Sequence, residues 1–553
     1  MFKRKTKLLQ PSGQGNSNFD GVEGHGMMTK GGSVNLGDPK RFLRKGIGSA
    51  NPANREERVK GALEVGSVHS RANTWRNLGE VLDEREKAKT LEGTDRFTKR
   101  DRETSATHRS GLQTATRLER IAKVARADKR YKFRALASLL SKGYLAECFA
   151  ELKRNKAPGI DGVTLDEYGL ELEKNLGDLV ARMKARKYKP LPVRRTYIPK
   201  ESGGKRPLGI PALEDKVVQM GITKILEAMF EPNFLEVSYG YRKGRSCHDA
   251  LNAVDKAIMT KPVSYIVDAD IKAFFDNVDH NWMQECLKQR ISDENFLRLV
   301  VRFLKAGIME EGKFFDTEKG TPQGGILSPV LSNIYLHYVL DLWVEKRLKK
   351  ECTGHVEQIR YADDFLICTQ RKLDAEKILE ALRERLSKFG LTLSDEKTRL
   401  IGFGRFARTN AEKLEKKAAT FDFLGFTHYC DRTRRGKFKV GRRTSRKKFQ
   451  MKLSALNEWM SLVRNKMNAA SIWDLLKRKL EGHYRYYGVS GNFSSIWSFY
   501  HHAKRIIFRW MNQRSQKRSF SWKRYQQYLA TYPLPRPKIY HNLYSLELGR
   551  EYA

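Results

Sequence analysis

The fold is decided by the stretch Gln358-Ile359-Arg360-Tyr361-Ala362-Asp363-Asp364-Phe365-Leu366-Ile367-Cys368. It begins with a short mixed run and ends with a continuously apolar one, which predicts a buried hairpin with the aspartates at its tip. Two adjacent carboxylates beside a buried strand are costly unless a cation neutralises them. The stretch therefore predicts a metal site, and the alternative is an exposed Asp-Asp turn.

A second acidic stretch, Tyr265-Ile266-Val267-Asp268-Ala269-Asp270-Ile271, has the composition of a strand. Successive side chains of a strand point to opposite faces, so Asp268 and Asp270 share one face and the other face is apolar. Phosphoryl transfer to a 3′-hydroxyl uses two metal ions roughly 3.5 to 4 Å apart. Three carboxylates from these two neighbouring elements can hold such a pair. The alternative is a solvated aspartate pair at a strand end.

Further blocks follow one another in a fixed order along the chain. They are Lys156-Ala157-Pro158-Gly159-Ile160-Asp161-Gly162-Val163, Tyr197-Ile198-Pro199-Lys200, Gly204-Lys205-Arg206-Pro207-Leu208-Gly209-Ile210-Pro211, Tyr239-Gly240-Tyr241-Arg242, Asp270-Ile271-Lys272-Ala273-Phe274-Phe275-Asp276, Gly320-Thr321-Pro322-Gln323-Gly324-Gly325-Ile326-Leu327-Ser328-Pro329, Leu391-Thr392-Leu393-Ser394-Asp395-Glu396-Lys397-Thr398 and Phe423-Leu424-Gly425-Phe426. In this set and order the chain resembles the group II intron-encoded reverse transcriptases, or maturases, from about residue 110 to residue 553.

The resemblance implies an α+β fold, the polymerase right hand. Its parts are the fingers, a palm with an antiparallel sheet that carries the carboxylates, and a mostly helical thumb called domain X. It also implies that Asp270, Asp363 and Asp364 are the catalytic residues and hold two Mg²⁺ ions.

The substrate residues are implied by the same resemblance. Lys200 and Arg206 lie on either side of the glycine-rich turn of a predicted fingers hairpin and would face the nucleotide triphosphate, where a guanidinium can bind two phosphate oxygens. Phe275 would lie under the sugar and select deoxynucleotides, and Gln323 would contact the primer-template pair. The alternatives are solvated basic residues at the turn and core packing for Phe275.

The charge of the chain agrees with a nucleic-acid partner. Lysine and arginine number 106 against 64 acidic residues, a formal net charge of +42. A surplus of this size indicates a long polyanionic partner. No apolar run approaches the roughly 18 residues that a membrane helix needs, so no membrane partner is expected.

The cysteines indicate a reducing compartment. They are widely separated and none forms a Cys-x-x-Cys pair: Cys148, Cys247, Cys286, Cys352, Cys368 and Cys430. We expect a cytoplasmic, bacterial-type location, with an organelle as the alternative. No cysteine follows Cys430, whereas many relatives carry a carboxy-terminal HNH endonuclease with cysteine pairs. We therefore expect the form without that domain, in which something else supplies the primer.

Three regions are expected along the chain. Residues 1–105 are rich in glycine, serine and charge and predict a basic, disordered extension. Residues 106–435 correspond to the fingers and palm, and residues 436–553 to the thumb. Thr164-Leu165-Asp166-Glu167 predicts a capping box at a helix start.

The thumb contains a dense basic cluster. It is Arg442, Arg443, Arg446, Lys447 and Lys448, ahead of a predicted helix through Met451, Leu453, Leu456 and Trp459. We expect this cluster to contact RNA. Tyrosines in His483-Tyr484-Arg485-Tyr486-Tyr487 and Trp522-Lys523-Arg524-Tyr525 could stack on bases or form core.

The resulting hypothesis is an RNA-directed DNA polymerase that binds its parent group II intron RNA, assists splicing and copies the intron during retrohoming. Its expected partners are the intron RNA, an RNA template with a DNA primer, target DNA and dNTPs. One alternative is a splicing-only RNA-binding maturase. Another is a related reverse transcriptase that serves antiphage defence or diversification.

Overall fold

The computed structural model describes residues 116–199, 204–514 and 521–544. The chain divides into two units, Met1–Lys60 and Gly61–Ala553, and every described residue belongs to the second unit. The extension predicted for residues 1–105 and the predicted triphosphate residue Lys200 lie outside the described residues.

The palm contains a four-stranded antiparallel sheet in the order β6-β7-β3-β8. Its strands are β3 (Tyr265–Asp270), β6 (Val356–Tyr361), β7 (Asp364–Thr369) and β8 (Arg399–Gly402). Strands β6 and β7 leave only Ala362 and Asp363 in the turn between them. The predicted hairpin and the predicted strand at residue 265 are both confirmed.

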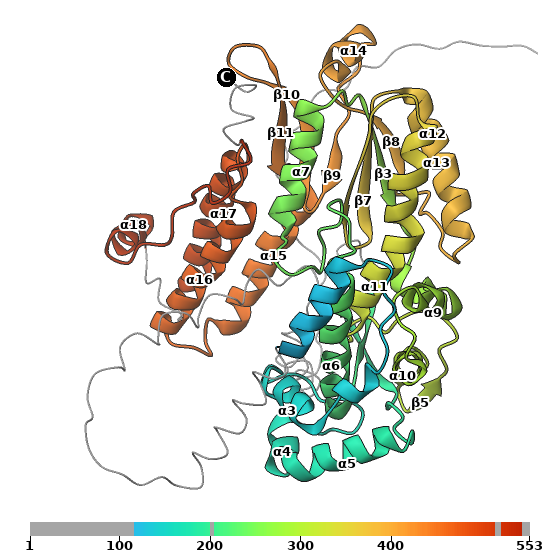
Figure 1. The fold of residues 1–553 in the computed structure, drawn as a ribbon. Helices are drawn as coiled ribbons and strands as arrows, with labels where there is room; N and C mark the ends of the chain where they lie inside the picture. The colour runs from blue at the N-terminus through green and yellow to red at the C-terminus, as the bar shows by residue number, and fades with distance from the viewer. Residues whose placement is uncertain (1–115, 200–203, 515–520, 545–553) are drawn as a thin grey trace, which may run out of the picture. The chain divides into compact units, whose positions relative to one another are not determined.

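Each face of the palm sheet is covered by helices. On one face Val267 and Ile367 pack with α13 (Lys372–Ser387), and on the other Ile266 and Leu366 pack with α7 (Cys247–Thr260). Figure 1 shows the strands between these helices. Because strand side chains alternate, Asp268 and Asp270 lie on the face of Ile266, at the end where the covering helix no longer excludes water. The predicted separation into an acidic and an apolar face is confirmed.

The larger core joins the palm to the fingers. Its helices are η3 (Ala137–Leu139), α3 (Lys142–Ala150), α4 (Leu165–Leu170), α5 (Leu172–Lys184), α6 (Leu213–Phe230), α8 (Phe274–Asn277), α9 (His280–Lys288), α10 (Glu294–Leu304), α11 (Ser328–Leu336) and α12 (Lys349–Glu351). Residues 116–127 are also helical. Helix α4 begins with the predicted capping box, in which Glu167 N donates to Thr164 Oγ1 and Thr164 N donates to Glu167 Oε2.

One long helical stretch departs from α-helical geometry. Between α11 and α12 the chain forms two π-helical segments, η4 (His337–Asp341) and η5 (Val344–Leu348). Such wide turns are rare and often occur at functional sites.

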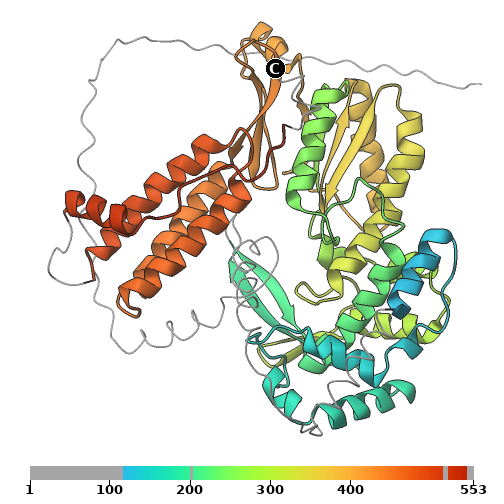
Figure 2. The same cartoon turned by 60° about the vertical axis from the view of Figure 1, so that its left-hand side comes forward.

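The fingers contain a second sheet in the order β2-β1-β4-β5. Strands β1 (Val193–Pro199) and β2 (Lys205–Ile210) form the predicted hairpin, which is the blue-green pair in Figure 2. Strands β4 (Ile308–Glu310) and β5 (Lys313–Phe315) extend the sheet through parallel pairing of β4 with β1.

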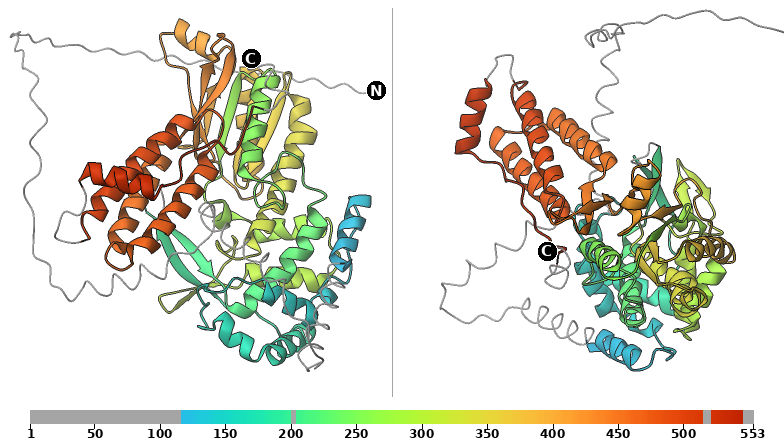
Figure 3. Two further views of the ribbon diagram at one scale, coloured as in Figure 1. Left: turned by 90° about the vertical axis from the view of Figure 1, so that its left-hand side faces the viewer. Right: turned by 90° about the horizontal axis from the view of Figure 1, so that it is seen from above.

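The thumb begins with a three-stranded sheet and continues as helices. The sheet is β9 (Phe421–Phe423), β10 (Phe426–Arg432) and β11 (Phe438–Thr444), preceded by α14 (Ala407–Lys413). The helices are α15 (Arg446–Val463), α16 (Ala469–Tyr487), α17 (Phe493–Met511) and α18 (Trp522–Thr531). Figure 3 shows α15, α16 and α17 packed side by side.

The expected domain boundary at residue 435 falls within the β10–β11 hairpin. A division there would break the ladder that pairs Phe426 with Thr444 and Arg432 with Phe438, so the hairpin belongs to one region. Among the described helices, none is both long enough and apolar enough to cross a membrane.

Candidate active site

The palm carboxylates lie on neighbouring strands. Asp270 at the end of β3 is the direct partner of Asp364 at the start of β7, and directly opposed residues in antiparallel strands point to the same face. Asp363 precedes Asp364 in the β6–β7 turn, and all three side chains are partly exposed. Their predicted placement at one end of the palm sheet is confirmed, and their catalytic role stays a prediction.

Two basic side chains pair with the carboxylates of β3. Lys397 Nζ lies 2.8 Å from Asp270 Oδ2, and Arg399 Nη2 lies 3.1 Å from Asp268 Oδ2. Burial and, to a smaller extent, the negative charges of Asp364 and Asp270 raise the pKa of Asp268 to about 6, against the lowering effect of Arg399. Negative charge is therefore crowded on this face, which is the environment that a divalent cation stabilises.

The donor set fits a hard cation. Within the ranges that the structure describes, no group of three or more His, Cys, Asp or Glu side chains is close enough together to hold a metal ion alone. Mg²⁺ is usually bound through one or two carboxylates, and substrate phosphates and water complete its coordination. The carboxylate oxygens of Asp270, Asp363 and Asp364 therefore suit such an ion when phosphates supply the other ligands.

The fingers hairpin carries the predicted phosphate residue Arg206. Arg206 is half-buried and pairs across the hairpin with Ile198, whereas Lys205 is exposed beside the Tyr197 ring. Gly209 N of the same strand donates to the carbonyl oxygen of Gln323 at 2.7 Å. The structure thus ties the strand that carries Arg206 to the loop that carries Gln323.

Phe275 lies in α8, directly after the strand that carries Asp270. Its ring is half-buried and meets Phe274 edge to face, with ring centroids 5.3 Å apart. The carbonyl oxygen of Phe275 accepts from Thr321 N at 2.7 Å. Phe275 and Gln323 therefore belong to one hydrogen-bonded set of loops beside Asp270, and their contacts with substrate stay a prediction.

One predicted RNA-binding residue is corrected by the structure. Arg442 is 1% exposed and forms an ion pair with Asp255 of α7, in which both side chains are fully buried. Arg442 lies in β11 next to Arg443, so strand alternation directs one of them inward and the other outward. Arg443, Arg446 and Lys447 are exposed and Lys448 is half-buried. The candidate RNA-facing set therefore excludes Arg442.

The thumb tyrosines belong mainly to the core. Tyr484 and Tyr525 are fully buried and Tyr487 is 3% exposed, so the packing alternative holds for them. Trp522 is 46% exposed at the start of α18. The rings of His483 and Phe499 stack with centroids 3.7 Å apart, inside the same helical bundle.

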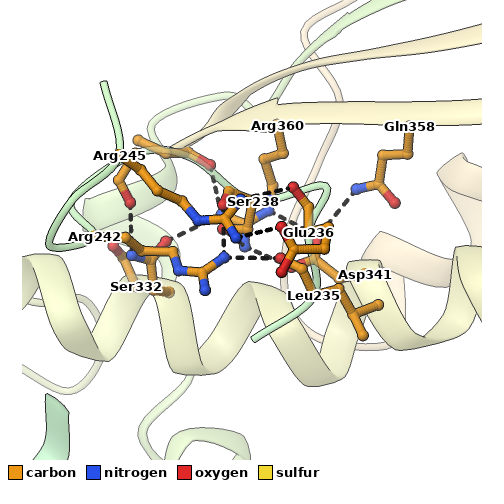
Figure 4. A network of polar contacts seen from close by, with 12 residues as sticks. Leu235, Glu236, Ser238, Arg242, Arg245, Ser332, Asp341, Gln358 and Arg360 are labelled. Carbon is orange, nitrogen blue, oxygen red and sulfur yellow. Dashed lines mark hydrogen bonds and ion pairs between the residues drawn. The ribbon is translucent and has the colours of Figure 1, made fainter. Parts of the chain in front are cut away.

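Sequence reasoning missed a buried polar network under the carboxylate turn. Figure 4 shows Arg360 and Asp341 at its centre, with Ser238 and Gln358 beside them. The sequence contains one sign of this network, because Arg360 lies in a predicted buried strand and a buried arginine needs a partner. The partner could not be found from the sequence, since Asp341 lies in a different element.

Comparisons with known proteins agree with this geometry. A family model described as "Reverse transcriptase (RNA-dependent DNA polymerase)" matches residues 198–428. Group II intron-encoded protein LtrA of Lactococcus lactis subsp. cremoris is 33% identical over 350 residues, which cover 53% of this chain and 58% of LtrA. The chain thus spans less than two thirds of the length of LtrA.

Protein YkfC of Escherichia coli (strain K12) is 33% identical over 273 residues, which cover 44% of this chain and 72% of YkfC. Among solved structures, a telomerase from Candida albicans aligns with a TM-score of 0.37 and 12% identity over 66% of this chain and 71% of that chain.

Reverse transcriptases are polymerases that act on nucleic acid and depend on a divalent metal ion. The matched region contains the whole palm sheet with its three carboxylates. Since YkfC is matched over most of its own length and LtrA is equally similar, the chain belongs to the group II intron-encoded reverse transcriptase family.

Proposed function

We propose that the chain is an RNA-directed DNA polymerase that also binds its parent group II intron RNA, assists splicing and copies the intron during retrohoming. The observation that carries the polymerase proposal is the strand register that sets Asp270 opposite Asp364, with Asp363 in the adjoining turn. Carboxylates fixed on two strands keep their spacing without the help of substrate, which a phosphoryl-transfer centre requires.

Asp270, Asp363 and Asp364 would hold two Mg²⁺ ions. When bound, these ions would supply activation of the primer 3′-hydroxyl and neutralisation of the leaving pyrophosphate. Lys397 already pairs with Asp270, so the ammonium group would have to release that carboxylate oxygen when an ion binds. The chain's contribution is to keep the oxygen ligands on one face and to place basic groups at its edge.

We also propose which residues contact the substrates beside the carboxylate-bearing face of the palm sheet. Arg206 and Lys200 would bind the dNTP triphosphate, Phe275 would lie against the sugar, and Gln323 would meet the paired template and primer. The hydrogen bonds from Gly209 to Gln323 and from Thr321 to Phe275 support a joint role, because they connect these segments directly.

Intron RNA would bind the thumb through Arg443, Arg446, Lys447 and Lys448. The net charge of +42 supports this part of the proposal. The proposed organisation moves the boundary expected at residue 435 ahead of the sheet of β9, β10 and β11, because a division at 435 would separate β10 from β11. The residues from 106 to this boundary are proposed for polymerisation, and the residues after it for intron binding.

Two variants test the proposal in a paired assay. Asp363→Ala should abolish primer extension on RNA and leave RNA affinity nearly unchanged, because it removes a carboxylate and no basic contact. Replacing Arg443, Arg446, Lys447 and Lys448 with Gln should weaken RNA binding, reduce its salt dependence and lower splicing of the host intron at low Mg²⁺. Extension on a short preformed primer-template should suffer less in that variant.

A matched control carries four Gln substitutions at exposed basic residues of α13 and its end: Lys372, Lys377, Arg383 and Lys388. It removes the same charge from another surface and should keep both activities. Extension at the wild-type rate by Asp363→Ala would refute the polymerase assignment. Equal loss of both activities in both test variants would refute the separate intron-binding surface.

A further inference from the structure

We propose that Arg360 is a positioning residue of the polymerase reaction, which holds the β6–β7 turn and so fixes the carboxylates of Asp363 and Asp364. This inference rests on the proposed polymerase function, because its kinetic test measures primer extension. It adds a residue that touches neither substrate nor metal and acts through the carbonyl group of Ala362.

The first observation is that the Arg360 guanidinium uses all its donors in the interior. The side chain is fully buried. Its Nε donates to Asp341 Oδ1 at 2.7 Å, and its Nη2 donates to Asp341 Oδ2 at 2.5 Å and to Ser238 Oγ at 2.7 Å. Its Nη1 donates to Asn333 Oδ1 at 3.1 Å and to the Ala362 carbonyl oxygen at 3.0 Å. A planar group bonded on every side has a single orientation.

The second observation is the shape of the turn that Arg360 contacts. Ala362 has φ of +58°, a left-handed conformation that is strained for a residue with a side chain. Only Ala362 and Asp363 connect the two strands, so the direction of the Ala362 carbonyl group sets the direction in which Asp363 leaves the turn. Arg360 bonds that carbonyl oxygen and thereby compensates the strain.

The third observation is a second brace on the same turn. Residues 237–240 run beside β6, where Tyr239 N donates to the Arg360 carbonyl oxygen at 2.9 Å. A Cβ atom on Gly240 would lie 2.3 Å from Ala362 N, so the segment presses directly on the turn. Asn333 Nδ2 donates to the Gly240 carbonyl oxygen at 2.8 Å while Asn333 Oδ1 accepts from Arg360. Arg360 therefore connects the turn, the brace and Asp341 of η4.

A general structural role and a positioning role can be separated by removing both charges. Arg360→Met alone leaves Asp341 buried without its partner, which destabilises any protein. The double variant Arg360→Met/Asp341→Leu has no buried charge and similar volume, so its fold can recover. The hydrogen bond to the Ala362 carbonyl oxygen does not recover. Loss of positioning should therefore persist where loss of stability does not.

The chain provides a matched control in the pair Arg442–Asp255. That pair is equally buried, and Arg442 has no place in the proposed RNA-facing set. The double variant Arg442→Met/Asp255→Leu makes the same chemical change away from the carboxylate turn. It should keep wild-type extension and wild-type metal binding.

The experiment uses the full chain and measures thermal unfolding, Mn²⁺ binding by electron paramagnetic resonance in the presence of dNTP but without primer or template, and kcat and KM for dNTP. Arg360→Met/Asp341→Leu should unfold near the wild-type temperature and bind Mn²⁺ roughly 10- to 100-fold more weakly, as expected when a group that orients metal ligands is lost. Its kcat should fall by about 100-fold, with little change in KM, because the reacting groups are misplaced by a fraction of an ångström or more.

Arg360→Lys keeps the positive charge and serves if the double variant does not fold. A single ammonium group cannot reach Asp341, Ser238, Asn333 and the Ala362 carbonyl oxygen together, so the kcat deficit should remain. Wild-type kcat and Mn²⁺ affinity in a folded variant that lacks the Arg360 guanidinium would overturn the proposal. Failure of the wild-type chain to extend a primer would instead refute the proposed function, and the Mn²⁺ measurement would still decide whether Arg360 positions the carboxylates.

Discussion

Two arginine–aspartate pairs are fully buried among the described residues, one within the palm and one between the thumb and the palm, and they differ in what they hold. Arg360 and Asp341 lie under the carboxylate turn, and the arginine reaches a backbone carbonyl group of that turn. Arg442 and Asp255 join β11 of the thumb to α7, which covers the palm sheet. The role of a buried arginine therefore depends on the groups that it contacts and not on the local charge density.

Strand alternation has different consequences in the palm and in the thumb. Alternation along β3 correctly predicted that Asp268 and Asp270 share a face. Arg442 and Arg443 are adjacent in β11 and therefore point to opposite faces, so the basic run of the thumb does not form one surface. Extending the alternation through residues 438–444 would have separated them.

The largest effect is expected from breaking the thumb pair. Arg442→Met should lower the free energy of unfolding by about 3 to 5 kcal/mol, because it leaves Asp255 buried without its cation. The double variant with Asp255→Leu should regain most of this loss. Urea unfolding measures both. A wild-type stability in the single variant would mean that Arg442 lies at the surface after all, as the sequence alone suggested.

A smaller effect on the free energy of unfolding is expected when the pH is lowered, because the thumb contains buried histidines. His428 of β10 and His483 of α16 are fully buried, and burial lowers the pKa of each to about 3. In the unfolded chain a histidine has a pKa of about 6.5. Their neutral forms therefore stabilise the fold above pH 6.5, and this stabilisation is lost as the pH falls from 6.5 towards 3.

His428→Phe should therefore reduce the stability lost between pH 6.5 and 5 by about 2 kcal/mol. The new ring can keep the stack on Phe421, whose centroid lies 4.7 Å from that of His428. Urea unfolding at the two pH values measures the effect, with the exposed His502→Phe as the control. Equal acid sensitivity in the wild type and His428→Phe would contradict the assignment.

A substitution in the fingers hairpin should change the kinetics of dNTP incorporation by roughly tenfold. Arg206→Ala should lower kcat/KM for dNTP by about this factor, since a charge-assisted hydrogen bond to phosphate contributes about 1.5 kcal/mol or more. Arg194→Ala is a matched control, because Arg194 is exposed on the paired strand and donates to the Pro158 carbonyl oxygen. If both variants behave alike, Arg206 is only a surface charge.

The smallest effect concerns the sugar. Phe275→Ala should admit ribonucleotides, raising their relative kcat/KM by several-fold, because removing one apolar contact changes discrimination by about 1 kcal/mol or more. Phe275→Tyr keeps the ring and should keep selection for dNTP. Unchanged discrimination in the alanine variant would assign Phe275 to packing, together with Phe274.

Local patterns accounted for much of the fold and of the candidate site. The β6–β7 hairpin, the shared face of Asp268 and Asp270, the fingers hairpin and the Thr164 capping box each depend on residues that are near one another in the chain. The contacts of Arg360 with Asp341 and of Arg442 with Asp255 depend on packing between distant elements, which no spacing reveals. The position of the domain boundary depends on the same kind of contact, because β10 and β11 pair across residue 435.

The π-helical segment η4 has a consequence for how this gene can vary. Asp341 reaches Arg360 from the last position of a wide helical turn, and each residue of an ordinary helix adds a rotation of about 100°. A codon gained between those for His337 and Asp341 would add such a rotation and turn Asp341 away from its partner. We expect viable alleles to exchange exposed residues in this helix but to keep the number of its residues unchanged.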